Sequence, residues 1–298
     1  MSKNIILVTV DCLRNDFYSP SNPGLSFLNF LANNSTYYPN CYNLADNTLS
    51  SIPQLLTSTY LNLIPFKESR KEEINAICQI KEPRVSIAQT LRDNGYNTYA
   101  FQSAPQLVPS FGYDKGFNNY INFNPFMSGS IPVLDDFYKY PFTKAEKINE
   151  YIISKKFEEP YFLWIHYSDV HDPYVSNSFP LPLSNFLWHR FYKKNSVIEN
   201  NGEILFPKIS NRFITHFKKL YAKQIKYVDD NLYDLFIKNK KFNLEDSHFI
   251  LTSDHGQALG EFNQIGHGYG LIPTPQVANI PLYVISDVAK ESNIDNKK

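Results

Sequence analysis

The hydrophobic positions of this 298-residue chain follow two different spacings. Short apolar runs are typical of buried strands, and such runs lie at 4–10, 97–102, 161–167, 247–252 and 282–285. Apolar residues that recur every three to four positions predict amphipathic helices, and this spacing is found at 24–33, 52–59, 84–94, 143–155 and 211–239. Strands that alternate with helices indicate βαβ units, so the pattern predicts an α/β fold with a mainly parallel sheet.

Two long segments, 104–142 and 173–210, show little periodicity and are rich in Pro, Asn, Ser and aromatic residues. Long loops within a domain are usually functional, so we expect both segments to be loops near the active face. Residues 290–298 are polar, and we expect a frayed tail there. The chain is therefore expected to form one domain over residues 1–289.

The composition indicates a folded protein in a reducing compartment. Hydrophobic residues make up 43% of the chain, which supplies ample material for a core and argues against disorder. The formal net charge is zero and no dense basic block is present, so a nucleic-acid partner is not expected. No apolar run reaches the roughly 18 residues that span a bilayer, and the amino terminus lacks the pattern of a signal peptide. Three widely spaced cysteines argue against a disulfide framework. We therefore expect a cytoplasmic protein.

Polar side chains at the ends of two predicted strands carry the candidate chemistry. The strand at 4–10 leads into Asp11, and the strand at 247–252 leads into Asp254 and His255, with His267 twelve residues beyond His255. Sheets of α/β proteins place their ligands at the carboxyl ends of strands. Two carboxylates with nearby imidazoles form a mixed oxygen and nitrogen set that suits a divalent metal ion.

The order of these and other short motifs along the chain resembles the sulfatase branch of the alkaline phosphatase superfamily. The matching blocks are 4–16, 22–31 with 37–40, 47–58, 95–100, 112–117, 162–174, 220–229 and 251–256. Each block alone is weak, but their shared order makes the resemblance specific. It implies a three-layer α/β/α sandwich of the alkaline phosphatase type, with a mixed, mainly parallel sheet. It also implies a sulfatase-like catalytic domain over 1–289, whose carboxyl-terminal subdomain is short or missing.

By this resemblance Thr48 stands at the position of the nucleophile, where sulfatases carry a cysteine that is matured to formylglycine. The segment from Thr48 to Ile52 has neither the cysteine, the proline nor the arginine of that pattern. A threonine hydroxyl can still act as a nucleophile when a metal lowers its pKa and helix amides stabilise the attacked group. Two alternatives remain at this stage: Thr48 and Ser51 only cap the helix, or Ser50 or Ser51 is the nucleophile.

The resemblance implies that Asp11, Thr48, Asp254 and His255 together enclose one divalent cation. Three oxygen ligands and one imidazole suit zinc or manganese, with magnesium or calcium as alternatives. No organic cofactor site is indicated. Sulfatases carry a second carboxylate where this chain has Cys12, and more often an asparagine where it has His255. The set is therefore more similar to the phosphotransferases and phosphodiesterases of the superfamily.

His171 and His267 resemble the residues that face the transferred group in this family. Two histidines can neutralise an oxyanion, or one of them can protonate the leaving oxygen. A second metal bound with Asp169 or Asp172 is the alternative. Other polar residues are expected to be structural: His166 as a core or supporting histidine, Arg14 and Asp16 as an ion pair, and His189, His216 and His248 without a role.

A stretch that grips the sulfate in sulfatases is also missing, because residues 101–107 contain neither lysine nor histidine. The first hypothesis is therefore a metal-dependent hydrolase or transferase of phosphate mono- or diesters that uses Thr48. A sulfatase without formylglycine is the alternative enzyme, and a non-catalytic sulfatase-like binding protein is the alternative from another class. The expected substrate is an ester of a small molecule, a glycan or a lipid head group; the oligomeric state is left open.

Overall fold

A seven-stranded sheet forms the centre of the computed structural model, which describes residues 2–60, 78–81, 83–124, 143–172, 174, 198–200, 203–205, 209–268 and 274–287. The strand order is β2-β11-β8-β1-β5-β3-β4. The strands are β1 (Asn4–Val10), β2 (Thr36–Tyr37), β3 (Asn97–Gln102), β4 (Asn119–Asn122), β5 (Tyr161–Tyr167), β8 (Ser247–Ser253) and β11 (Leu282–Ile285). Pairing is parallel from β8 through β4, and antiparallel at β11 and β2. The mixed, mainly parallel sheet is confirmed.

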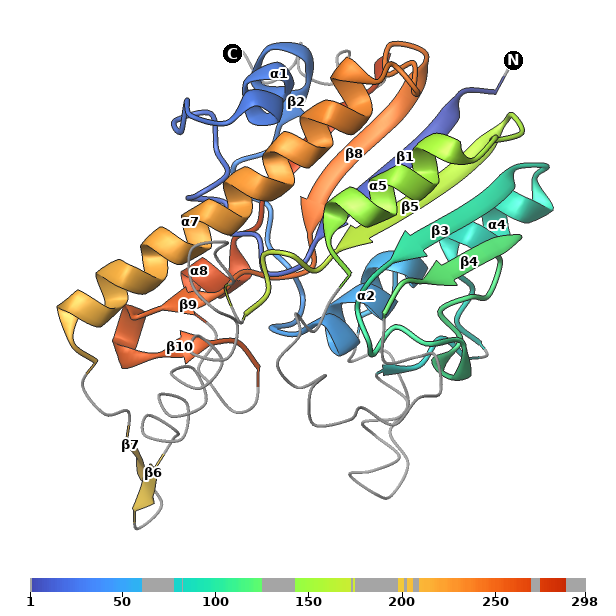
Figure 1. Cartoon of the computed structure of the whole chain (residues 1–298). Coiled ribbons are helices and arrows are strands. Elements are labelled where there is room, and N and C mark those ends of the chain that lie inside the picture. The colour runs from blue at the N-terminus through green and yellow to red at the C-terminus, as the bar shows by residue number, and fades with distance from the viewer. Residues whose placement is uncertain are drawn as a thin grey trace, which may run out of the picture.

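Helices cover both faces of the sheet, as Figure 1 shows. On one face lie α1 (Ser26–Asn34), α5 (Ala145–Ser154) and α7 (Asn211–Tyr233), which continues into a π-helical turn at Asp234–Lys238. On the other face lie α2 (Thr48–Thr57) and α4 (Ile87–Asp93). This arrangement is the three-layer sandwich that the family resemblance implied.

The alternation of side chains along β1 explains the two layers. Ile6 and Val8 point into the core beneath α1, α5 and α7, whereas Leu7 belongs to the core beneath α2 and α4. Successive side chains of a strand point to opposite faces, and both faces of a covered parallel sheet are apolar. The central strands therefore appear in the sequence as continuous hydrophobic runs.

Smaller elements complete the fold. They are a 3-10 turn at Pro109–Phe111, the hairpin β6 (Ile198–Asn200) and β7 (Glu203–Leu205), the hairpin β9 (Ala258–Leu259) and β10 (Ile265–Gly266), a 3-10 turn at Glu261–Asn263, and α8 (Pro275–Ala278). Within the described ranges, no helix is both long and apolar enough to cross a membrane.

Two expectations about elements were wrong. The segments 104–142 and 173–210 were expected to be loops, yet they contain β4, β6 and β7. The four residues of β4 are only partly buried at the edge of the sheet, so they lack the apolar run of a central strand. Helix α2 begins at Thr48 rather than at residue 52, because the side chain of Asn47 caps its first turn by accepting from the Ser50 amide. The polar tail at 290–298 lies outside the described residues.

Candidate metal and active site

Parallel pairing places Asp11 and Asp254 at one edge of the sheet. Val10 of β1 pairs with Ser253 of β8, so the next residue of each chain segment leaves the sheet beside the other. Both aspartates are buried, as is His255. After β8 the chain passes against α8 at Gly256, where a Cβ atom would lie 2.1 Å from the carbonyl oxygen of Gln276. Only glycine fits directly after His255.

Three predicted metal ligands converge on a nitrogen atom of the fourth, His255. Nε2 of His255 lies 3.6 Å from Oδ1 of Asp11 and 3.5 Å from Oδ2 of Asp254. Oγ1 of Thr48 lies 3.3 Å from the same nitrogen. The structure therefore brings together all four residues that the sequence suggested, although they come from three separate parts of the chain.

Three of the four carboxylate oxygens of this cluster lack a hydrogen-bond partner in the described part of the chain. Both side-chain oxygens of Asp11 and Oδ2 of Asp254 are buried without a partner among the described residues. Burial, and then the negative charge of Asp254, raise the pKa of the Asp11 carboxyl. Buried carboxylates without partners are costly unless they are neutralised or coordinate a cation. The donor set of three oxygens and one imidazole fits a divalent metal ion.

Hydrogen bonds hold the cluster in place. Oδ1 of Asp254 accepts from the amides of His255, at 2.8 Å, and of Cys12, at 3.3 Å. Cys12 has a φ of 63°, in the left-handed region, which directs its amide at this carboxylate. Nδ1 of His255 donates to the carbonyl oxygen of Gly256, at 2.9 Å. In the neutral ring the free lone pair is therefore on Nε2, the nitrogen that faces the carboxylates.

The loop after β1 is also supported from α7 and β8. Tyr221 donates its hydroxyl to the carbonyl oxygen of Cys12, at 2.7 Å, and accepts from the Arg14 amide, at 2.9 Å. Ser253 accepts from the amide of Leu13, at 3.0 Å. Asp11 and Cys12 therefore lie on a loop that is fixed from two sides, which favours preorganised ligand positions.

Thr48 is the first residue of α2, and its side chain is buried. The cap of this helix is Asn47, so the alternative in which Thr48 or Ser51 serves as the cap is wrong. Ser51 instead donates to the carbonyl oxygen of Ala45, at 3.0 Å. Of the three hydroxyl residues at 48–51, Thr48 is the one with a contact to the metal cluster in the described structure. The first amides of α2 follow it directly, as anion binding at a helix start requires.

His171 and His267 lie beside this cluster. The ring centroid of His267 is 4.3 Å from that of His255 and 5.0 Å from that of His171. Burial opposes protonation of His171, but the carboxylates of Asp172 and Asp11 outweigh it and raise its pKa. Burial, and then the neighbouring histidines, hold the pKa of His267 well below its usual range. At neutral pH the pair therefore combines one histidine that readily takes a proton with one that stays neutral.

The sequence missed Gln257. Its amide nitrogen donates to Oδ1 of Asp172, at 3.2 Å, so its amide oxygen faces the other way. That oxygen accepts from Nδ1 of His267 and lies 3.7 Å from Sγ of Cys12. Its position two residues after His255 is the only sequence signal, and a glutamine without a motif does not stand out.

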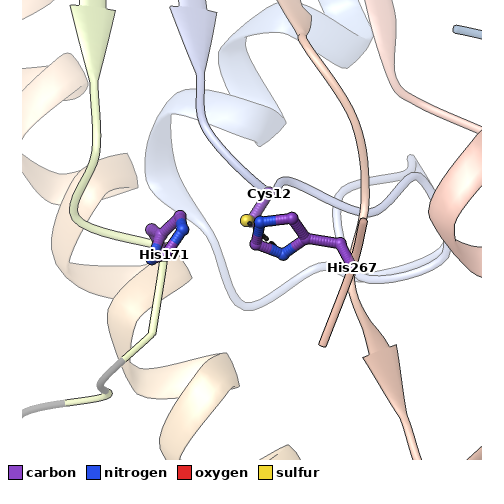
Figure 2. A group of neighbouring side chains, drawn as sticks. All are labelled: Cys12, His171 and His267. Atoms are coloured by element: carbon purple, nitrogen blue, oxygen red, sulfur yellow. Dashed lines mark hydrogen bonds between the residues drawn. The ribbon is translucent and has the colours of Figure 1, made fainter. Parts of the chain in front are cut away.

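The carboxylates that the alternative two-metal scheme required have other partners. Asp169 accepts from the amide of Ala145, at 3.1 Å, and so caps α5. Asp172 accepts from Gln257 and lies 3.7 Å from Nδ1 of His171. Among the described residues, the side chain that completes a group with the two histidines is Cys12 (Figure 2).

His166 lies behind the metal cluster, and Arg14 and Asp16 form the expected ion pair. Nδ1 of His166 contacts the Thr9 hydroxyl at 2.8 Å, and its Nε2 lies 3.9 Å from Asp11 behind the metal cluster. Arg14 pairs with Asp16 at 2.7 Å and also with Glu261 at 3.1 Å. His189 lies outside the described residues.

The fold and the strand-end cluster define a protein of the alkaline phosphatase superfamily. The sulfatase family model matches residues 3–297, and the chain therefore belongs to the sulfatase family. A comparison with curated proteins finds no match.

Solved structures with this fold have different activities. The chain is 15% identical to the phosphonate monoester hydrolase of Agrobacterium radiobacter, with a TM-score of 0.63 over 96% of this chain and 68% of that one. It is 16% identical to the C-terminal periplasmic domain of the phosphoethanolamine transferase EptC from Campylobacter jejuni, with a TM-score of 0.56 over 98% and 82%. It is 13% identical to BT1596, a 2-O GAG sulfatase, with a TM-score of 0.59 over 96% and 64%. At these identities the likeness shows the fold alone.

Proposed function

We propose that this protein hydrolyses or transfers phosphate mono- or diesters, with Thr48 as the nucleophile. The observation that carries the proposal is the position of the Thr48 hydroxyl, 3.3 Å from Nε2 of His255. It lies beside two buried carboxylates, three of whose oxygens have no hydrogen-bond partner among the described residues. Asp11, Thr48, Asp254 and His255 would hold a divalent cation, and their donor atoms suit zinc or manganese. Such a cation would favour the ionised form of the Thr48 hydroxyl and would draw negative charge from the attacked group.

The remaining roles follow from the groups that surround Thr48. The Thr48 oxygen attacks phosphorus and the alcohol departs, which leaves a phosphothreonine. The amides of Thr48 and Leu49, which precede the capped Ser50 amide at the start of α2, would donate to the oxygens of the transferred group. His171, whose pKa is raised, supplies a proton to the leaving oxygen. Attack by water then completes hydrolysis, and attack by a second alcohol completes transfer.

Phosphate is favoured over sulfate because of what the site lacks. A threonine–sulfate ester has no hemiacetal route for expelling sulfate, whereas the aldehyde hydrate of formylglycine does. Residues 101–107 supply no lysine or histidine to the site. Solved structures with this fold include a phosphonate monoester hydrolase and a phosphoethanolamine transferase as well as a sulfatase, so the fold is compatible with a phosphorus-centred reaction. The alcohol side is proposed to be a small molecule, a glycan or a lipid head group.

A panel of matched substrates tests the proposal. Aryl phosphate, aryl phosphodiester and aryl sulfate are each supplied to enzyme loaded with Zn²⁺, Mn²⁺, Mg²⁺ or Ca²⁺. We expect turnover of the better phosphate ester to exceed that of the sulfate by at least about 100-fold, which corresponds to about 2.7 kcal/mol of discrimination. Sulfate turnover equal to or above phosphate turnover would make the protein a sulfatase without formylglycine. No turnover of any ester would favour a binding protein.

A further inference from the structure

His166 is a fully buried histidine of β5, in register with Thr9 of β1, and it lies next to the metal cluster. Its Nε2 is 3.9 Å from Oδ2 of Asp11 and has no hydrogen-bond partner among the described residues. One ligand atom each from Asp11, His166 and Asp254 lies within 4.8 Å of the others. Two roles are compatible with this position: His166 is a further ligand of the cation, or it donates a hydrogen bond to Asp11.

The hydrogen bonds of Thr9 decide between these roles. Trp164 donates from Nε1 to the Thr9 hydroxyl oxygen, at 3.0 Å. An indole nitrogen is a donor only, so the proton of the Thr9 hydroxyl is left for another acceptor. Nδ1 of His166 lies 2.8 Å from this hydroxyl, and the carbonyl oxygen of Ile165 lies 3.4 Å from it. Hydrogen bonds from a hydroxyl to oxygen are about 2.5–3.0 Å long, so the Thr9 hydroxyl donates to Nδ1.

This hydrogen bond fixes the tautomer of His166. A neutral imidazole that accepts at Nδ1 carries its proton on Nε2, and complete burial favours the neutral ring. A protonated ring nitrogen has no free lone pair for a metal ion, so the ligand role does not fit. Nε2 is instead a buried donor beside the carboxylate of Asp11.

The two oxygens of Asp11 lie near different histidines. Oδ1 is 3.6 Å from Nε2 of His255, whereas Oδ2 is the oxygen near Nε2 of His166. We propose that His166 is a positioning residue, which donates from Nε2 to Oδ2 of Asp11 and leaves Oδ1 for the cation. The separation of 3.9 Å is longer than an N–H···O bond, and a turn of the carboxylate about its soft last torsion closes it. The inference rests on the metal role of Asp11 in the proposed function.

The position of the proton can be measured in metal-free protein. The chain has seven histidines, and after labelling with ¹⁵N the two nitrogen shifts of a neutral ring show which nitrogen carries the proton. The signals of His166 are those that disappear in His166→Gln. We expect them to show the proton on Nε2 in the wild type. A proton on Nδ1 would overturn the proposal and would make Nε2 available as a metal ligand.

Two substitutions separate the Nε2 donor from the rest of the ring. The amide nitrogen of a glutamine can take the place of Nε2, whereas the shorter asparagine reaches only the place of Nδ1. We expect His166→Gln to keep the Zn²⁺ dissociation constant within about threefold of the wild type, and His166→Asn to raise it by about 10- to 100-fold. Competition with a chelating dye measures both values, and thermal unfolding of the metal-free variants checks that they fold. Wild-type affinity in His166→Asn, or an equal loss in both variants, would overturn the proposal.

Neither measurement uses ester turnover, so the inference can fail while the proposed function stands. A wild-type protein that binds no divalent cation would overturn both. A wild-type protein that binds Zn²⁺ and carries the His166 proton on Nε2, yet turns over no ester, would overturn the proposed function alone.

Discussion

The hydroxyl of Thr48 lies 3.3 Å from Nε2 of His255, closer than either carboxylate oxygen of the cluster is to that nitrogen. Thr48→Ala removes the nucleophile, and we expect turnover of phosphate esters to fall by at least about 1000-fold. Thr48→Ser keeps a hydroxyl and should retain part of the activity. Steady-state kinetics on metal-loaded protein measure both. Ser50→Ala is the matched control, and loss of activity there with an active Thr48→Ala would assign the nucleophile to Ser50.

Metal binding should stabilise the fold, because the cation supplies partners for carboxylate oxygens that otherwise have none. At a metal concentration of about 100 times the dissociation constant the gain is about 2.7 kcal/mol, or several degrees in Tm. Asp254→Asn should show a much smaller gain. In chelator the same variant should melt above the wild type, because one of two neighbouring buried charges is gone. An equal metal-induced shift in both proteins would show that Asp254 is not a ligand.

Gln257 should act on the reaction through His267, since its amide oxygen accepts from Nδ1 of that ring. Gln257→Leu removes this acceptor, and we expect kcat/KM to fall by about 10- to 100-fold, as for other residues that orient a site histidine. A double-mutant cycle separates this role from a general loss of structure. In a His267→Ala background the same substitution should have little further effect; a full additional loss would contradict the positioning role.

Helix α1 depends on Asp229 of α7 for its capping. Leu25 at its N-cap makes no side-chain hydrogen bond, whereas the Asp229 carboxylate accepts from the amides of Phe27 and Leu28 and from the hydroxyl of Tyr18. Asp229→Ala should lower the free energy of unfolding by about 2–4 kcal/mol, because buried donors lose their acceptor. Denaturant titration measures the change. The neighbouring Asp230 forms only an exposed pair with Lys226, so Asp230→Ala should change stability by less than about 1 kcal/mol.

Asp169 should make stability depend on pH. Burial raises the pKa of this carboxyl to about 7, despite the hydrogen bond from the Ala145 amide. Its pKa is higher in the folded than in the unfolded state, so the free energy of unfolding falls as pH rises from about 4 to about 7 and is level above that. The loss approaches about 4 kcal/mol for a shift of about three units.

The variant Asp169→Asn lacks the titratable carboxyl but keeps an oxygen that accepts from the Ala145 amide. We expect the variant to match the wild type near pH 4 and to exceed it in stability at pH 8, as followed by denaturant titrations across this range. A stability difference between the two proteins that does not change with pH would contradict the assigned pKa.

The sequence predicts the central sheet well because the strands covered on both faces are continuous apolar runs. The same rule fails for β4, since Asn119 to Asn122 form a partly buried edge strand that tertiary contacts rather than hydrophobicity define. It also fails for the start of α2, where the cap at Asn47 decides the boundary.

The candidate site also contains residues that the sequence predicts and a residue that it does not. Asp11, Asp254 and His255 can be predicted because they follow strands, and the family resemblance adds Thr48, His171 and His267. Gln257 could not be found in this way, since its importance arises from contacts with Asp172 and His267 on other loops. The cytoplasmic location stays a prediction.

Strand β1 is inserted between β5 and β8, which lie more than 150 residues further along the chain. During synthesis the segment that carries Asp11 leaves the ribosome long before its two neighbours exist. The sheet, and with it the metal cluster, can close only after β8 has emerged, and such distant pairings make folding slow. Metal should therefore bind late, to the nearly complete chain, and chains that end before Asp254 should not retain it.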